Sequence, residues 1–235
     1  MLTTLLGVTL LSVSALATTW APAEKIDPIT GQKIKVKEIM SYGSYIYNWP
    51  SKYHLVFWPL TDQNFIWFSA ESGYAAFGND FEKLNKEQKD QLAGWLKENY
   101  NPANQPFTHI EKLNWLGKVY AQINMDDDFW CRFYRLMAYT YQDDEMKSIQ
   151  YMKKAFPLLE KKLKRDPSWI ERIETLYLLG EYSRQLGKIE EAKKYFEQVK
   201  KEKFKDQNGQ ERVGHPYFLQ LVKDREELMK QGSAD

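Results

Sequence analysis

The sequence contains almost no cysteine, no excess charge of either sign and no common catalytic motif. A single cysteine among 235 residues, Cys131, excludes an internal disulfide and any metal site built from cysteines alone. The formal net charge of +1 argues against a general nucleic-acid binder, whose surface carries a basic excess. Gly-rich phosphate loops, Gly-X-Ser-X-Gly elbows and His-Glu-X-X-His helices are all missing. We therefore predict a protein that is not an enzyme and binds neither a cofactor nor nucleic acid.

The first 23 residues also lack charge. Residues 2–17 are apolar or small throughout, and Ala-X-Ala-like cleavage sites end at Ala17 and Ala23. This pattern predicts a secretory signal and an extracytoplasmic (periplasmic or secreted) protein, with cleavage after Ala17 preferred. The run is also long enough for a retained membrane anchor, although the lysines that follow it would then favour the cytoplasmic side. A buried core helix is the third interpretation of residues 1–23.

Residues 24–78 are predicted to form a small β-rich head. Polar and apolar residues alternate over 33–37, as in a half-buried strand, and residues 53–58 and 65–68 read as two further strands. Aromatic residues are concentrated here, with 12 among the 36 residues from Tyr42 to Phe77. Most of this cluster fits a core, whereas four members lie in an irregular Gly- and Ser-containing stretch and are our candidate partner contacts: Tyr42, Tyr45, Tyr47 and Trp49.

Residues 79–235 are predicted to be helical, which makes the fold class α+β and mostly α. Capping residues and apolar stripes place helices at about 79–100, 108–124, 129–142, 145–165, 168–186, 188–204 and 216–230. The connections are short, so neighbouring helices should pack antiparallel as hairpins.

A helical repeat is visible within this tail. Gly180 and Ala192 are small where two helices of a hairpin would cross, Phe196 would fill the adjoining space, and Gly187 would end the first helix. These positions match tetratricopeptide offsets, and residues 113–133 repeat part of the pattern around Gly117. The alternative is a generic bundle of αα-hairpins in which the small residues coincide by chance.

The chain resembles an uncharacterised bacterial family at Gly73-Tyr74-Ala75-Ala76-Phe77 and at Asp80-Phe81-Glu82-Lys83-Leu84. The resemblance covers about residues 26–205. It implies a zinc-ribbon-like head with two Cys-X-X-Cys knuckles, followed by a tetratricopeptide-like tail. No activity is established for that family.

This chain departs from the family pattern at every position where a metal ligand is implied. Asp27, Thr30, Ser69 and Ser72 stand in the places of the cysteines, while Pro28, Gly31 and Gly73 keep the turns. Neutral hydroxyls are poor zinc ligands, so we predict no metal at these lost ligand positions. A structural zinc contributes on the order of 10 kcal/mol to a small module. We expect aromatic packing to replace that contribution.

The remaining polar residues suggest structural roles. His54, His109 and His215 lack metal-ligand spacing and are expected at the surface or at helix ends, and Cys131 is expected in the core. Acidic residues at 126–128 and 143–145 are expected to cap helices.

Three functions remain open. The first is a non-enzymatic scaffold or adaptor of the cell envelope that binds a protein partner through its repeats. The second is an accessory subunit of a membrane-associated complex, held by residues 1–23. The third, which we rank lowest, is an enzyme with a carboxylate-based site.

Overall fold

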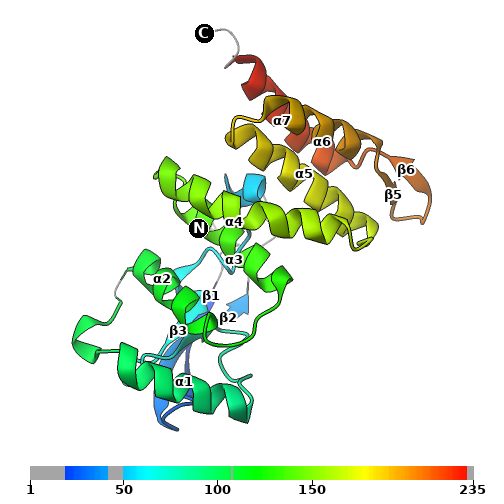
Figure 1. The fold of residues 1–235 in the computed structure, drawn as a ribbon. Coiled ribbons are helices and arrows are strands. Elements are labelled where there is room, and N and C mark those ends of the chain that lie inside the picture. Colours follow the sequence, from blue (N-terminus) through cyan, green and yellow to red (C-terminus); the bar gives the residue numbers. More distant parts are fainter. Residues whose placement is uncertain (1–18, 42–49, 107, 232–235) are drawn as a thin grey trace, which may run out of the picture.

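The structure, a computed structural model, describes residues 19–41, 50–106 and 108–231. Over these residues the chain is mostly helical, with small two-stranded antiparallel sheets and seven α-helices packed in adjacent pairs. Figure 1 shows the helices stacked in chain order, from the head and its first helices at one end to the last three helices at the other. The predicted α+β, mostly α class is therefore confirmed.

The head contains two antiparallel strand pairs. β1 (Thr19–Ile26) pairs with β2 (Lys33–Ser41), and β3 (Ile66–Phe68) pairs with β4 (Ala75–Phe77). The alternation predicted for residues 33–37 is present in β2, where Val36 is buried between exposed Lys35 and Lys37. Because β1 begins at Thr19, residues 19–23 of the expected signal or anchor form part of this hairpin, whereas residues 1–18 lie outside the described part of the chain.

Side-chain caps set the beginnings of the helices. The helices are α1 (Lys86–Asn99), α2 (His109–Tyr120), α3 (Asp127–Thr140), α4 (Glu145–Leu163), α5 (Trp169–Gln185), α6 (Ile189–Lys201) and α7 (Pro216–Gln231). Thr108, Asp126 and Asp144 each accept a hydrogen bond from a backbone N–H of the first turn, and the sequence predicted this role for Asp126 and Asp144. The predicted helix start at residue 79 was wrong, because Asn85 and Gln88 form a capping box and Phe81 lies in a turn before it.

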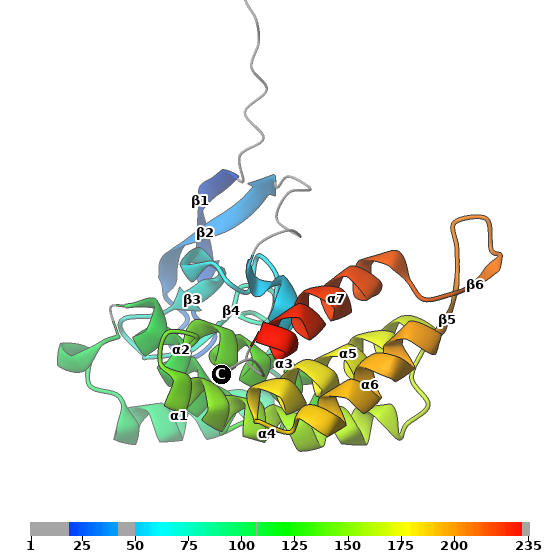
Figure 2. The same ribbon diagram turned by 90° about the horizontal axis from the view of Figure 1, so that it is seen from above.

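Two segments differ from the predicted strands. Residues 53–58 were expected to be a strand, but they begin in the 3-10 helix η2 (Pro50–His54) and continue in a turn. Shorter 3-10 helices lie at η3 (Gln63–Phe65) and η4 (Pro102–Asn104). A hairpin of β5 (Lys203–Lys205) and β6 (Glu211–Val213), visible at the edge of the molecule in Figure 2, was not predicted.

Two apolar clusters hold the molecule together. One joins the β strands of the head to α1, α2 and α3, and the other joins α3 and α4 to α5, α6 and α7. In the second cluster Gly180 lies against the ring of Phe196, and a Cβ atom at this position would stand 2.5 Å from that ring. Close crossing of α5 and α6 therefore requires glycine here. Within the described ranges we find no helix with the length and apolar character needed to cross a membrane.

Candidate functional site

The four lost ligand positions come together in the head. The carboxylate of Asp27, which is fully buried, accepts hydrogen bonds from Ser69 Oγ at 2.7 Å and from Thr30 Oγ1 at 3.0 Å on Oδ2. The backbone N–H of Ile29 donates to Oδ1 at 2.8 Å. Ser72 lies one turn further, where its Oγ accepts from the Tyr74 N–H and its own N–H points to Ser69 Oγ. One carboxylate thus ties two separate turns together.

The helices α1 and α2 hold the second of these turns. Gly73 has a φ of +76°, and the ring of Tyr100 lies so close that a Cβ atom would stand 2.2 Å from its Cγ. The indole N–H of Trp115 donates to the Gly73 carbonyl at 2.6 Å, and the Tyr100 hydroxyl donates to the Ala70 carbonyl at 2.7 Å. These contacts explain why the Gly73–Phe77 stretch needs both its glycine and the aromatic residues of the helices.

The residues at this site do not fit a zinc ion. Zinc sites use thiolate, imidazole or carboxylate ligands, and this site offers one carboxylate whose oxygens are already hydrogen-bonded. Among the described residues, no group of three or more His, Cys, Asp or Glu side chains could hold a metal. Aromatic packing lies beside the network, with Tyr74 and Trp67 against Phe81 at ring separations of 4.9 and 5.8 Å. The two turns are therefore joined by hydrogen bonds, which the sequence did not predict.

Residues 51–57 connect the head to the helical tail. Arg135 of α3 donates to the carbonyls of His54 and Leu55, and the Tyr177 hydroxyl of α5 donates to the Tyr53 carbonyl at 3.4 Å. The Tyr53 hydroxyl donates to Asp224 of α7 at 2.9 Å. The guanidinium of Arg135 and the hydroxyl of Tyr177 thus satisfy backbone carbonyls that a sheet would otherwise pair, which explains why residues 53–58 do not form a strand. The face made by α3, α5 and α7 is covered by the chain itself.

A buried ionic cluster lies beneath this segment. Glu181, only 1% exposed, accepts two hydrogen bonds from the guanidinium of Arg184, and Arg225 lies 3.6 Å from the same carboxylate and stacks on Tyr53. His54 was expected near the surface but is buried. Burial and the neighbouring arginines lower its pKa to about 4. The cluster joins α5 and α7 to residues 51–57.

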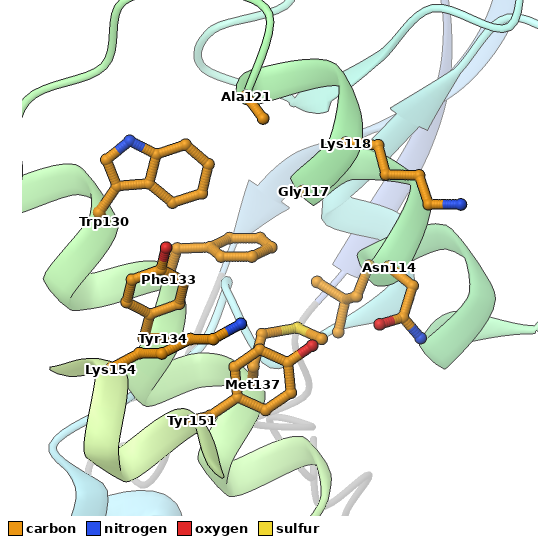
Figure 3. Close-up of a pocket in the computed structure, with 11 residues that line it drawn as sticks. Asn114, Gly117, Lys118, Ala121, Trp130, Phe133, Tyr134, Met137, Tyr151 and Lys154 are labelled. Atoms are coloured by element: carbon orange, nitrogen blue, oxygen red, sulfur yellow. The ribbon is translucent and has the colours of Figure 1, made fainter. Parts of the chain in front are cut away.

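An open groove lies elsewhere, between α2 and the hairpin of α3 and α4. Its volume is about 530 Å³. Leu113, Phe133 and Met137 form a buried apolar floor, and Gly117 leaves room for the ring of Phe133. Figure 3 shows Asn114, Lys118 and Ala121 on the α2 side and the side chains of α3 and α4 opposite them.

Aromatic side chains form one wall of the groove. Trp130 stacks on Tyr134 with ring centroids 5.5 Å apart, Tyr134 lies 6.3 Å from Tyr151, and Tyr151 stacks on Tyr141 at 5.8 Å. We call Trp130, Tyr134, Tyr151 and Tyr141 the aromatic row; the first three line the groove, and Tyr141 extends the row beyond it. Lys154 places its ammonium 5.1 Å from the ring centre of Tyr151 and 5.6 Å from that of Tyr134. The wall therefore offers flat apolar rings beside a positive charge.

The predicted site residues have mixed outcomes. The candidate contacts Tyr42, Tyr45, Tyr47 and Trp49 lie outside the described residues. Cys131 lies in the core as expected, and burial raises the pKa of its thiol. The groove was missed, although the run Phe129–Met137 carries aromatic residues at helical spacing on more than one face, which a single buried stripe does not require.

Comparison with known proteins finds a similarity within the tail. Residues 130–215, from α3 to just past β6, match the model of a bacterial family described as uncharacterized protein conserved in bacteria (DUF2225). Neither the curated proteins nor the solved structures contain a match to this chain. The match agrees with the expected likeness to an uncharacterised bacterial family over these residues.

Proposed function

We propose that this protein is a non-enzymatic scaffold that binds a protein partner in the groove between α2 and the α3–α4 hairpin. The observation that carries the proposal is the groove itself, which combines an apolar floor, the aromatic row and two exposed lysines. Aromatic and apolar surface supplies most of the energy in protein recognition, and polar groups at the rim set its orientation. The face of α3, α5 and α7 is a weaker candidate, because residues 51–57 already cover it.

Two finer features of the fold belong to the same proposal. The tail is of the tetratricopeptide type, because Gly180 against Phe196 on α5 and α6 repeats as Gly117 against Phe133 on α2 and α3. The head is a ribbon remnant without metal, in which Asp27 joins the two turns. We place the protein in the cell envelope, with residues 1–18 providing export or anchoring.

The test compares partners captured by three forms of the full chain from native envelope extracts. The forms are the wild type, the double variant Lys118→Glu/Lys154→Glu, and a matched control with Lys153→Glu and Lys194→Glu. Lys153 is next to Lys154 on α4 but does not line the groove, and Lys194 lies on α6. We expect one or more proteins to be retained by the wild type and the control and lost from the groove variant. Equal capture by all three forms would contradict the proposed site.

A further inference from the structure

The groove presents mainly hydrogen-bond donors and positive charge. Lys118 stands exposed on the α2 rim, and Lys154 reaches from α4 toward the opening in Figure 3. The indole N–H of Trp130 has no hydrogen-bond acceptor among the described residues. Burial raises the pKa of Tyr134 and of Tyr151, so both hydroxyls keep their protons at neutral pH. The amide of Asn114 is already engaged, since it donates to Tyr141 at 2.7 Å.

No carboxylate balances these groups. The groove has neither Asp nor Glu on its described lining, and neither lysine has an ion-pair partner within the parts of the chain that the structure describes. Other lysines are paired, as with Lys25 and Glu38 at 2.6 Å or Lys200 and Glu226 at 2.8 Å. Two ammonium groups that have no carboxylate partner among the described residues, beside a buried apolar floor, favour a ligand that carries negative charge and apolar surface together.

We propose that the partner enters the groove as a linear acidic segment, with Asp or Glu side chains at Lys118 and Lys154 and an apolar side chain on Phe133 and Met137. This inference rests on the proposed function and specifies the chemistry of the partner. A protein segment fits better than nucleic acid, because two lysines make a small positive site and the chain has a net charge of only +1.

The test is a selection of random linear 12-residue peptides on the immobilised full chain, followed by fluorescence anisotropy with the selected peptides. We expect binders enriched in Asp and Glu and containing at least one large apolar residue. Exchange of their Asp and Glu for Asn and Gln should weaken binding about tenfold or more, which corresponds to about 1.4 kcal/mol. Lys118→Glu/Lys154→Glu should have the same effect, whereas Lys153→Glu/Lys194→Glu should leave the affinity unchanged.

A groove-filling variant, Ala121→Trp, separates failure of this inference from failure of the proposed function. Ala121 is exposed on the α2 side of the groove, so the larger side chain can obstruct the opening without entering the core. Peptides that are blocked by Ala121→Trp but bind equally well as acids and amides would overturn the acidic segment and leave a peptide-binding groove. A selection that yields no peptide sensitive to Ala121→Trp would overturn both.

Discussion

The buried histidine within residues 51–57 makes the stability of the protein depend on pH in a way that can be worked out. His54 has a pKa of about 4 in the folded protein against an ordinary value of 6.5. Between these two pH values the unfolded chain binds a proton that the folded chain does not, so stability falls as the pH falls. A difference of about 2.5 in pKa corresponds to about 3 kcal/mol once the pH is below 4, and about 2 kcal/mol is already lost at pH 5.

Urea unfolding at pH 7 and at pH 5 measures this effect. With a slope of about 2 kcal/mol per molar urea, the His54 contribution shifts the midpoint by about 1 M between the two pH values. His54→Gln should remove that part of the shift, whatever it does to stability at pH 7, because glutamine does not titrate. His215→Gln is the control, because His215 is only half-buried and lies outside residues 51–57, although burial lowers its pKa as well.

The difference between wild type and His54→Gln isolates one group from the carboxylates that also titrate on the way to pH 5. If both proteins lose the same stability over this range, His54 is accessible to protons in the folded state. Residues 51–57 would then not be packed on α3, α5 and α7 as described here.

Three further predictions concern the head, the helix crossing and the N-terminus. Asp27→Ala leaves Ser69 Oγ and the Ile29 N–H without an acceptor and should lower the free energy of unfolding in urea by about 3 kcal/mol, while Asp27→Asn should lower it less. A chelator should not change the melting temperature of the wild type, and one bound zinc per chain would contradict the metal-free head. Gly180→Ala places a methyl group against Phe196 and should destabilise the protein by about 1–3 kcal/mol. Gly94 is exposed on α1, and a Cβ atom there would meet nothing within 4 Å, so Gly94→Ala should stabilise the protein by about 0.5–1 kcal/mol. Similar effects at both sites would show that α5 and α6 do not cross closely. Removal of residues 1–17 leaves β1 whole and should keep the melting temperature, but removal of residues 1–23 leaves only residues 24–26 of β1 and should lower it clearly. Equal melting temperatures of the two truncated proteins would mean that β1 contributes nothing to stability.

Local signals in the sequence were sufficient for most of the helices. Asp126 and Asp144 were recognisable as caps because each precedes an amphipathic stretch, and the structure places both at helix starts. Residues 53–58 were wrongly predicted to be a strand, because they form an apolar run of β-forming residues and the sequence alone does not show that such a run is irregular. Its conformation depends instead on Arg135, about 80 positions away in the chain.

The candidate site could be predicted only in part. The positions of Asp27 and Ser69 followed from the resemblance, but the hydrogen bond between them joins turns 42 residues apart and depends on the folded head. The groove depends on how α2 packs beside the α3–α4 hairpin, a tertiary relation that helical periodicity does not contain. The sequence showed part of its aromatic row as aromatic residues at helical spacing within Phe129–Met137, but not that α2 would lie opposite them.

Photo-crosslinking from inside the groove tests the central claim most directly. A photoreactive phenylalanine analogue at residue 121 would project from the α2 side into the groove, whereas the same analogue at Lys194, exposed on α6 and not part of the groove lining, serves as the control. We predict a crosslinked partner from position 121 alone, with mass spectrometry locating the crosslink in an acidic segment of that partner. Crosslinks of equal yield from both positions, or none from position 121 where a partner is nevertheless captured, would contradict a binding site in this groove.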